Sequence, residues 1–365
     1  MTKGRGAVPS QLGRILVTGC RGYLGAVLAG RLGSAGYTVL GLDSAWFERW
    51  ALSGMPVHPW AQKDIRDLRP EDVRDVDAIV HLAALSNDPL GELDPDLTEA
   101  VNVHATVQLA RHARAAGVRR FVFASSCSVY GAAGDDWVDE TTSPKPLTPY
   151  ALSKVQAERA LQELASTNFS PVALRLATLY GFSPSLRLDL VANNLAVLGV
   201  ATKQVLLRSD GSAWRPLLHV EDAATAILKV LEAPSEAVAG EVFNVGSDAQ
   251  NYQVRDVAEA VCRVVPGTCV RYASGAGTDP RSYRVSFRKF TERFPEAAPR
   301  RDLMAGLEAF VLEFSRRGLA PELQRSANFE RIQQLRWLRN FGLMTEHCRW
   351  KHRALAGSAA RVFGG

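Results

Sequence analysis

The chain has 365 residues, of which 47% are apolar and 22% charged, a balance typical of a folded globular protein with one large or two small domains. Its formal net charge is +5, and residues 318–365 alone carry eight Lys or Arg side chains against three Glu, so the rest of the chain is close to neutral. Because residues 1–317 carry almost no net charge, the sequence excludes general binding of nucleic acids as the function.

The cysteines and the apolar runs indicate where the protein works. The five cysteines are odd in number and contain no C-x-x-C pair, which argues against a disulfide framework or a zinc site and favours a reducing compartment. No run of 18 apolar residues is present, and the N-terminus lacks the apolar core of a signal peptide. We therefore predict a cytoplasmic protein with no metal, no nucleic-acid partner and no membrane association.

The first predicted unit is a strand, a glycine turn and a helix. Residues 1–13 are rich in glycine and should form a flexible lead-in, whereas residues 14–18 are apolar and β-prone. Gly19, Gly22 and Gly25 follow, and the pattern then becomes helical. Glycines permit a tight turn and let a pyrophosphate approach the helix N-terminus. Their G-x-x-G-x-x-G spacing differs from the general G-x-G-x-x-G fingerprint, so a turn whose glycines serve only packing is the alternative.

A second strand over residues 37–42 ends at Asp43, roughly 20 residues beyond the glycine turn. The dinucleotide fold places a ribose-binding carboxylate at this distance. The Asp43 side chain would accept hydrogen bonds from both ribose hydroxyls and repel a 2′-phosphate, which favours NAD over NADP as the cofactor. The alternative is an ordinary turn residue at a strand end.

Strands and helices alternate along the rest of the first half, which predicts an α/β fold with a doubly wound parallel sheet. The further predicted strands cover residues 57–60, 77–84, 119–125, 171–178 and 241–246, and a helix covers residues 97–116. The regularity loosens beyond residue 180, which indicates a smaller, irregular substrate domain. The predicted divisions are 14–180 for nucleotide binding with 215–246 contributing to it, 181–317 mainly for substrate, and 318–365 as a basic helical extension.

Tyr150 and Lys154 stand at i and i+4 on one predicted helix face, downstream of a serine-rich strand end at residues 125–128. A lysine beside a phenol favours the phenolate and should lower the pKa of the tyrosine from about 10 toward the working range. Such a tyrosine can take or give the proton of a sugar hydroxyl during hydride transfer. Alone, the Y-x-x-x-K pattern is weak, because a solvated helix pair has the same spacing.

The order of these motifs resembles that of the extended short-chain dehydrogenase/reductase superfamily, and within it the NAD-dependent epimerase/dehydratase group, which acts on nucleotide sugars. The resemblance covers about residues 14–317 and implies a Rossmann-like nucleotide domain. It rests on Thr18–Gly25, Asp64-Ile65, His81–Ala84, Asn102, Ser125–Gly131, Tyr150-x-x-x-Lys154, Arg215–Asp222 and Asn244–Gly246.

The resemblance implies a role for each matching position. Ser126, Tyr150 and Lys154 would be catalytic, and Asn102 would help to position Lys154. The remaining cofactor contacts would come from Gly19, Gly22, Tyr23, Leu24 and Gly25 at the pyrophosphate, Asp43 at the ribose, Asp64 and Ile65 at the adenine, and Leu82, Ala83 and Ala84 at the nicotinamide half. The substrate contacts would come from Ser126, Thr178, Asn194, Leu195, Arg215, Arg281 and Tyr283.

Departures from the family pattern bear on the reaction. The 4,6-dehydratases of the group carry Asp-Glu after the catalytic residue, where this chain has Cys127 and Ser128, so dehydration is disfavoured. Members that epimerise at C3 and C5 use a nearby cysteine, but it aligns with Ser128, and we expect Cys127 to be buried and inert. Thr178 stands where 4-epimerases often have Asn, and Arg281 or Arg284 is expected to replace an arginine commonly found before Asp279.

Other conspicuous residues have simpler interpretations. His81 and His219 are expected to be structural core residues. The tail helix over residues 328–341 carries an apolar stripe that includes Phe341, with Arg331 off the stripe. A basic amphipathic helix can bind a membrane surface or nucleic acid, but packing on its own domain or on a partner subunit is the expectation.

The function predicted from the sequence is that of an NAD-dependent nucleotide-sugar epimerase acting at C4 through a transient 4-keto sugar. One alternative is an NAD-dependent dehydrogenase or reductase acting on a nucleotide-linked or free sugar, and another is a non-catalytic NAD-binding scaffold. The resemblance also implies a homodimer formed by the helices near residues 97–116 and 150–166, which light scattering would test.

Overall fold

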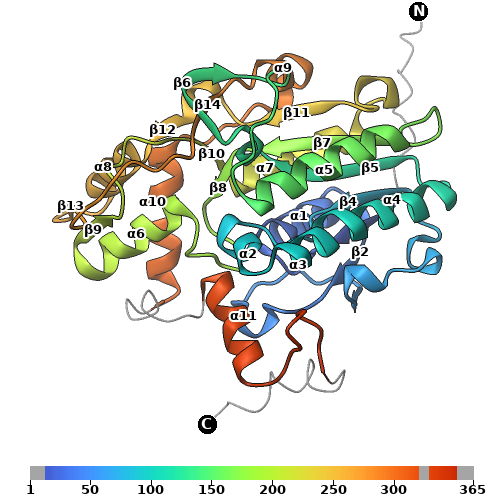
Figure 1. Ribbon diagram of the computed structural model, residues 1–365, viewed down its shortest axis with the longest axis horizontal. Coiled ribbons are helices and arrows are strands. Elements are labelled where there is room, and N and C mark those ends of the chain that lie inside the picture. The colour runs from blue at the N-terminus through green and yellow to red at the C-terminus, as the bar shows by residue number, and fades with distance from the viewer. Residues whose placement is uncertain (1–12, 320–328, 352–365) are drawn as a thin grey trace, which may run out of the picture.

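A computed structural model describes residues 13–319 and 329–351. Its centre is a seven-stranded parallel sheet, with helices on both faces, in the order β11-β7-β5-β4-β1-β2-β3 (Figure 1). The predicted α/β class and the doubly wound parallel sheet are confirmed. The strands of this sheet are β1 (Arg14–Thr18), β2 (Thr38–Asp43), β3 (Trp60–Gln62), β4 (Ala78–His81), β5 (Arg120–Ser126), β7 (Ser170–Leu176) and β11 (Val242–Val245).

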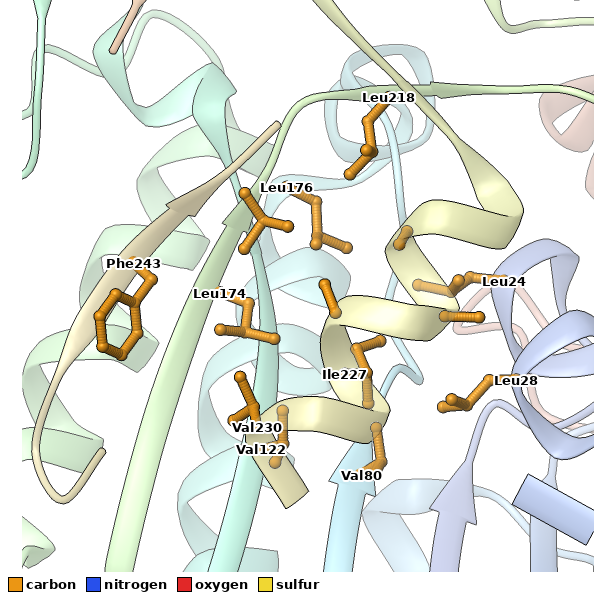
Figure 2. Close-up of a cluster of buried hydrophobic side chains, with 14 of the residues drawn as sticks. Leu24, Leu28, Val80, Val122, Leu174, Leu176, Leu218, Ile227, Val230 and Phe243 are labelled. Atoms are coloured by element: carbon orange, nitrogen blue, oxygen red, sulfur yellow. The ribbon is translucent and has the colours of Figure 1, made fainter. Parts of the chain in front are cut away.

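Alternate residues of the central strands enter two separate cores. Ile15 and Val17 of β1 pack with α1 (Tyr23–Ser34) and α7 (Val220–Glu232) on one face, as Figure 2 shows for Leu24, Leu28, Ile227 and Val230. Leu16 enters the core of the other face, with residues of α4 (Ala105–Ala115) and α5 (Pro149–Leu164). Burial on both faces explains why these strands are almost continuously apolar.

The predicted helix over residues 97–116 forms as several pieces. It consists of α3 (Pro95–Glu99), a π-helical turn at Ala100–His104 and α4. The short helix α2 (Asp88–Leu93) precedes it, with Asn87 as its N-cap. π-Helical turns are rare in proteins, and those that occur inside longer helices often lie at functional sites.

The second half builds a smaller layer beside the sheet. Helices α6 (Val191–Thr202), α8 (Val254–Val264) and α10 (Leu303–Arg316) share a third core with β9 (Gln204–Leu207) and β10 (Trp214–His219). Residues 220–245 return to the nucleotide half, because α7 packs on α1 and β11 pairs with β7. The remaining elements are β6 (Ala132–Val138), β8 (Thr178–Tyr180), β12 (Asn251–Gln253), β13 (Cys269–Tyr272), β14 (Ser282–Val285) and α9 (Arg288–Arg293).

Strand β6 was not predicted from the sequence. Its residues read Ala-Ala-Gly-Asp-Asp-Trp-Val and are mostly exposed, so they carry no apolar alternation. The strand forms through parallel pairing with β14, almost 150 residues further along the chain. A pairing partner that distant leaves no local signal.

Part of the predicted extension 318–365 is described, and it packs on its own chain. Helix α11 (Arg331–Asn340) lies at the lower edge of the molecule in Figure 1, next to α2. Two details of the expected stripe are wrong: Phe341 is 65% exposed, whereas Arg331 is only 3% exposed. Residues 320–328 and 352–365, and all of the predicted lead-in except Gly13, lie outside the described residues. In the described part of the chain, no helix is long and apolar enough to span a membrane.

Candidate active site

A cavity of about 1030 Å³ opens at the carboxyl ends of the parallel strands and extends toward α6, β9 and β10. Its sheet side lies where β1 stands between β2 and β4, a crossover point at which open α/β sheets bind ligands. All of the cofactor, catalytic and substrate residues predicted from the sequence line this cavity, with the single exception of Asn102.

The glycine turn fits a dinucleotide pyrophosphate. Gly19 has a φ of +73°, and a Cβ there would meet the Ala83 backbone nitrogen at 2.8 Å. A Cβ on Gly25 would lie 2.0 Å from the Gly19 carbonyl oxygen. Gly22 is the N-cap of α1 and has no side chain to satisfy the first backbone N–H groups of the helix. Free N–H groups and the helix dipole make this end an anion site.

Asp43 ends β2 at the rim of the same cavity. Its carboxylate accepts hydrogen bonds from the backbone N–H of Arg21 at 2.9 Å and of Ala45 at 2.8 Å, and burial raises its pKa. Each carboxylate oxygen retains capacity for one more donor, which ribose hydroxyls can fill. Asp64, the predicted adenine contact, is held by the Arg66 guanidinium at 2.6 Å.

Ser126, Tyr150 and Lys154 converge from two elements. Ser126 ends β5, while Tyr150 and Lys154 stand on α5, and all three side chains line the cavity. The Lys154 ammonium donates to the Ala124 carbonyl oxygen at 2.7 Å and lies 5.8 Å from the Tyr150 ring centre. The structure thus brings the three side chains that the sequence singled out to one cavity.

The expected lowering of the Tyr150 pKa is wrong for this arrangement. Burial raises the pKa of Tyr150 to about 12, an effect that the nearby Ser126 hydroxyl only partly opposes. Burial also lowers the pKa of Lys154 to about 7, although the Glu158 charge opposes the shift. The protein by itself thus holds Tyr150 as a neutral phenol, a hydrogen-bond donor and a proton source.

Asn102 does not line the cavity and supports it from behind. It lies in the π-helical turn, where its side-chain oxygen accepts from Leu85 N–H at 2.8 Å and its side-chain nitrogen donates to the Ser153 hydroxyl at 3.0 Å. It makes no direct contact with Lys154, but it ties α5 to the loop after β4. Asn102 was expected to help position Lys154; its contacts reach α5 through Ser153 instead, and its role in positioning stays a prediction.

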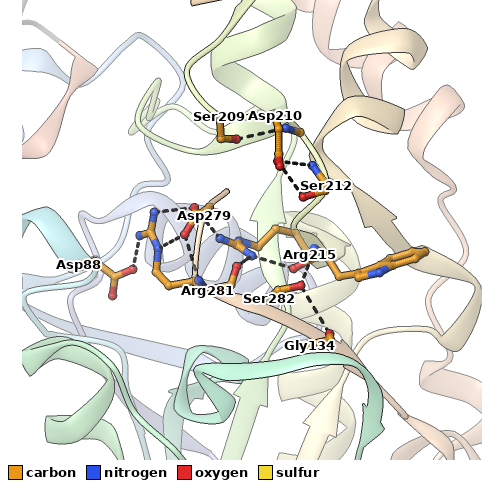
Figure 3. A network of polar contacts seen from close by, with 11 residues as sticks. Asp88, Gly134, Ser209, Asp210, Ser212, Arg215, Asp279, Arg281 and Ser282 are labelled. Atoms are coloured by element: carbon orange, nitrogen blue, oxygen red, sulfur yellow. Dashed lines mark hydrogen bonds and ion pairs between the residues drawn. The ribbon is translucent and has the colours of Figure 1, made fainter. Parts of the chain in front are cut away.

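The substrate half is organised by a chain of ion pairs (Figure 3). Arg215 and Arg281 both donate to Asp279, at 2.9 and 2.8 Å, and Arg281 also pairs with Asp88 at 2.8 Å. The Arg215 guanidinium lies 5.6 Å from the Tyr283 ring centre. Two predicted substrate residues, Arg215 and Arg281, thus share one carboxylate, which fixes both side chains in the wall.

Comparison with known proteins agrees with this geometry. A family model described as "NAD dependent epimerase/dehydratase family" matches residues 15–246. The chain belongs to this family. It is 31% identical over 274 residues to a UDP-glucose 4-epimerase of Mycolicibacterium smegmatis, a match that covers 69% of this chain and 82% of that protein.

Solved structures of epimerase/dehydratase proteins share the fold. MoeE5 in complex with UDP-glucuronic acid and NAD superposes with a TM-score of 0.73 at 28% identity, covering 84% of this chain and all of that one. DesIV, a dTDP-glucose 4,6-dehydratase of Streptomyces venezuelae with NAD bound, gives 0.72 at 26% identity and covers 84% and 98%. The cofactor of the family is NAD, as predicted.

A buried ion pair that was not predicted from the sequence also lines this cavity. Arg187 and Asp189 pair at 2.9 Å, the Arg187 guanidinium also donates to the Ser86 hydroxyl at 3.1 Å, and the Asn87 amide donates to Asp189 at 2.7 Å. All four residues line the cavity. A local signal existed, because the two charges alternate with leucines over residues 186–190 and so share one face of an extended segment.

Cys127 and Ser128 occupy the positions at which the dehydratase pattern has two carboxylates. Cys127 is 1% exposed and its thiol donates to the Arg175 carbonyl oxygen at 3.2 Å, with a pKa raised by burial. Its expected burial is confirmed. Ser128 does line the cavity, and among the described residues its buried hydroxyl has no partner. A hydroxyl is available there to a ligand, but no carboxylate is.

His81 is a core residue, as expected. Its imidazole lies between the hydroxyls of Thr18 and Thr106, at 2.7 and 2.8 Å, and Thr106 in turn donates to the Asn102 carbonyl oxygen. Thr106 must therefore accept from Nε2–H, which leaves Nδ1 unprotonated as the acceptor for Thr18. Burial, and secondarily the Lys154 charge, lower the pKa of His81 to about 3. His219 is likewise buried, where it caps α7.

We predict that acid destabilises the protein through His81. Its pKa falls from 6.5 to about 3 on folding, so the unfolded state binds more protons between these values and stability declines as pH drops through that window. When the pH falls from 7 to 5, His81 should lower the free energy of unfolding by about 2 kcal/mol. Denaturant unfolding at both pH values should show this loss in the wild type and in the exposed control His104→Gln. An equal loss in His81→Gln would contradict the assignment.

Proposed function

We propose that the protein is an NAD-dependent nucleotide-sugar epimerase that inverts C4 of the sugar through a transient 4-keto intermediate. The observation that carries the proposal is that Ser126, Tyr150 and Lys154 meet in one cavity in which no carboxylate follows Ser126. The similarity to the M. smegmatis UDP-glucose 4-epimerase supports both the reaction and the substrate class.

The side chains divide the proton chemistry between them. NAD, when bound, supplies a hydride acceptor and then a donor, and its oxidised ring carries a positive charge that favours a nearby phenolate. Tyr150 takes the proton of the sugar C4 hydroxyl and later returns it, while the Ser126 hydroxyl holds the reacting oxygen through a hydrogen bond. Lys154 lies below the Tyr150 ring and stabilises the phenolate when charged.

Dehydration needs an acid and a base that this cavity does not present near Ser126. Elimination of water removes a proton from carbon and protonates a leaving hydroxyl, which are tasks for carboxyl groups. The two carboxylates that line the central part of the cavity, Asp88 and Asp189, are each paired with an arginine. At Asp189 the Arg187 charge outweighs the effect of burial and lowers the pKa, which disfavours the protonated carboxylic acid.

Incubation of the purified holoprotein with a panel of nucleotide sugars tests this function. The expected result is conversion to the C4 epimer, read by NMR, with absorbance near 340 nm almost flat because the cofactor is regenerated in each cycle. A steady stoichiometric rise at 340 nm would identify a dehydrogenase instead. Loss of the C6 hydroxyl in the product would identify a dehydratase, and no turnover of any sugar would favour a non-catalytic role.

The homodimer and the cytoplasmic location stay predictions. The outward side of α4 and α5 includes exposed Arg111, Leu152 and Arg159, the surface through which the family resemblance implies pairing. A monomer by light scattering would contradict the dimer.

A further inference from the structure

The C-terminal segment reaches into the cofactor end of the cavity. Glu330, Arg331 and Ile332, at the start of α11, line the cavity beside Phe47. Arg331 is 3% exposed, and its guanidinium lies 4.2 Å over the Phe47 ring centre. These residues lie outside the part of the chain that the family model matches, so family comparison assigns them nothing.

Arg331 is a buried charge without a countercharge in direct contact. Its guanidinium donates to the Gln334 side-chain oxygen at 2.9 Å and to the Ser185 hydroxyl at 2.7 Å, both neutral groups. Within residues 13–319 and 329–351 it forms no ion pair, whereas Arg187, the buried arginine nearby, is neutralised by Asp189. A buried charge that lacks a partner is strongly destabilising, so a ligand that supplies the opposite charge is favoured there.

The hydrogen-bond partners of Arg331 connect it to the first turn of α1, at the cavity that the glycine turn also lines. Ser185, its hydrogen-bond partner, follows Ser183, whose hydroxyl donates to the Tyr23 carbonyl oxygen at 2.7 Å in the first turn of α1. Phe47, under its guanidinium, belongs to the same cavity wall as Asp43. Burial and the charge of Arg187 lower the pKa of Arg331 to about 9, while Asp189 and Asp43 oppose this, so the group is cationic at neutral pH.

The segment is anchored in this position by its own contacts. The Trp350 indole N–H donates to the Ser44 carbonyl oxygen at 2.7 Å, directly after Asp43. Arg66 donates to the His347 carbonyl oxygen at 2.9 Å, and Trp337 packs edge-on against Trp50 at 5.7 Å. Arg331 is therefore held at the cavity without help from a ligand.

We propose that Arg331 is a phosphate-binding residue for the cofactor, and that its guanidinium neutralises the pyrophosphate of bound NAD opposite the N-terminus of α1. A pyrophosphate carries the charge that the site lacks, and guanidinium groups bind phosphate oxygens through paired N–H donors. The glycine turn cannot provide this charge itself, because its one cation, Arg21, is engaged in a two-point ion pair with Glu48. The proposal concerns cofactor binding and is independent of the sugar that reacts.

Calorimetric titration of cofactor-free protein with ADP-ribose tests the role of Arg331. ADP-ribose contains the pyrophosphate but no nicotinamide, so catalysis is not involved. We expect Arg331→Gln to weaken binding by about 10–100-fold, the usual effect of losing a charge-assisted hydrogen bond, and to flatten the dependence of affinity on salt. Arg331→Lys should lose less, since the charge remains. The exposed residue Arg336 on the same helix gives the control Arg336→Gln, which should bind like the wild type.

Adenosine and 2′-phospho-ADP-ribose complete the test. Adenosine lacks phosphate, so its affinity should be the same in the wild type and in both Arg331 variants. Equal affinity of Arg331→Gln and wild type for ADP-ribose would overturn the proposal, as would a parallel loss for adenosine, which indicates a structural role through Ser185. A loss confined to 2′-phospho-ADP-ribose would also overturn it. If Arg331→Gln does not fold, the comparison of ADP-ribose with adenosine in Arg331→Lys decides the outcome.

Discussion

Replacement of Tyr150 by phenylalanine is expected to lower kcat by about 10²–10⁴-fold, the range for loss of a general acid–base group, while the NAD content of the purified protein is unchanged. Tyr150 and Ser126 both line the cavity, so the phenol oxygen is the group placed to exchange a proton with a sugar hydroxyl. The ring is retained in the variant, so the packing of α5 against β5 is preserved. Turnover by NMR and cofactor content after denaturation measure the two effects.

The control for this variant is Tyr272→Phe, which removes a phenol oxygen from a side chain that is 54% exposed on β13. It should retain wild-type kcat. Full activity in Tyr150→Phe would exclude the proposed mechanism. A complete loss of bound NAD would contradict the expectation that the phenol oxygen serves turnover and not cofactor binding.

Replacement of Arg175 by methionine is expected to lower the free energy of unfolding by about 3–5 kcal/mol, the cost of leaving a buried ion partner alone. Arg175 of β7 pairs with Glu158 of α5 at 2.7 Å, and their side chains are only 7% and 4% exposed. The same guanidinium donates to the Tyr130 hydroxyl at 3.0 Å, and Glu158 also accepts from the Ser125 hydroxyl. The variant therefore leaves the buried Glu158 carboxylate without its arginine partner, directly behind the end of β5 that carries Ser126.

Two comparisons show whether burial is the cause. The double variant Glu158→Leu/Arg175→Met removes both charges and should recover most of the lost stability, because an apolar pair of similar size can replace a buried ion pair at little cost. Lys289→Met breaks an ion pair with Glu241 whose side chains are 40% and 39% exposed, and it should cost no more than about 1 kcal/mol. Equal losses in the buried and exposed variants, measured by denaturant unfolding, would refute this account.

The features that sequence predicted are those encoded by short stretches of chain. The parallel sheet follows from apolar runs such as residues 77–84, and the cofactor turn follows from three glycines that tolerate positive φ and close backbone contact. Tyr150 and Lys154 fall on one helix face because of their i, i+4 spacing. Periodicity and backbone sterics act over a few residues, so they can be read without knowledge of the fold.

The tertiary structure alone decided the properties that depend on distant neighbours. It set the pKa of Tyr150, because burial among segments far apart in the chain raises that pKa to about 12. It also determined that the Asn102 side chain is hydrogen-bonded to Ser153. It brought Arg331 from the C-terminal segment to a cavity formed mainly by residues 19–283. Desolvation and charge interactions depend on distances in space and not on separation along the chain. The spacing of apolar residues in a helix therefore does not show which of its side chains will face a cavity formed by distant segments.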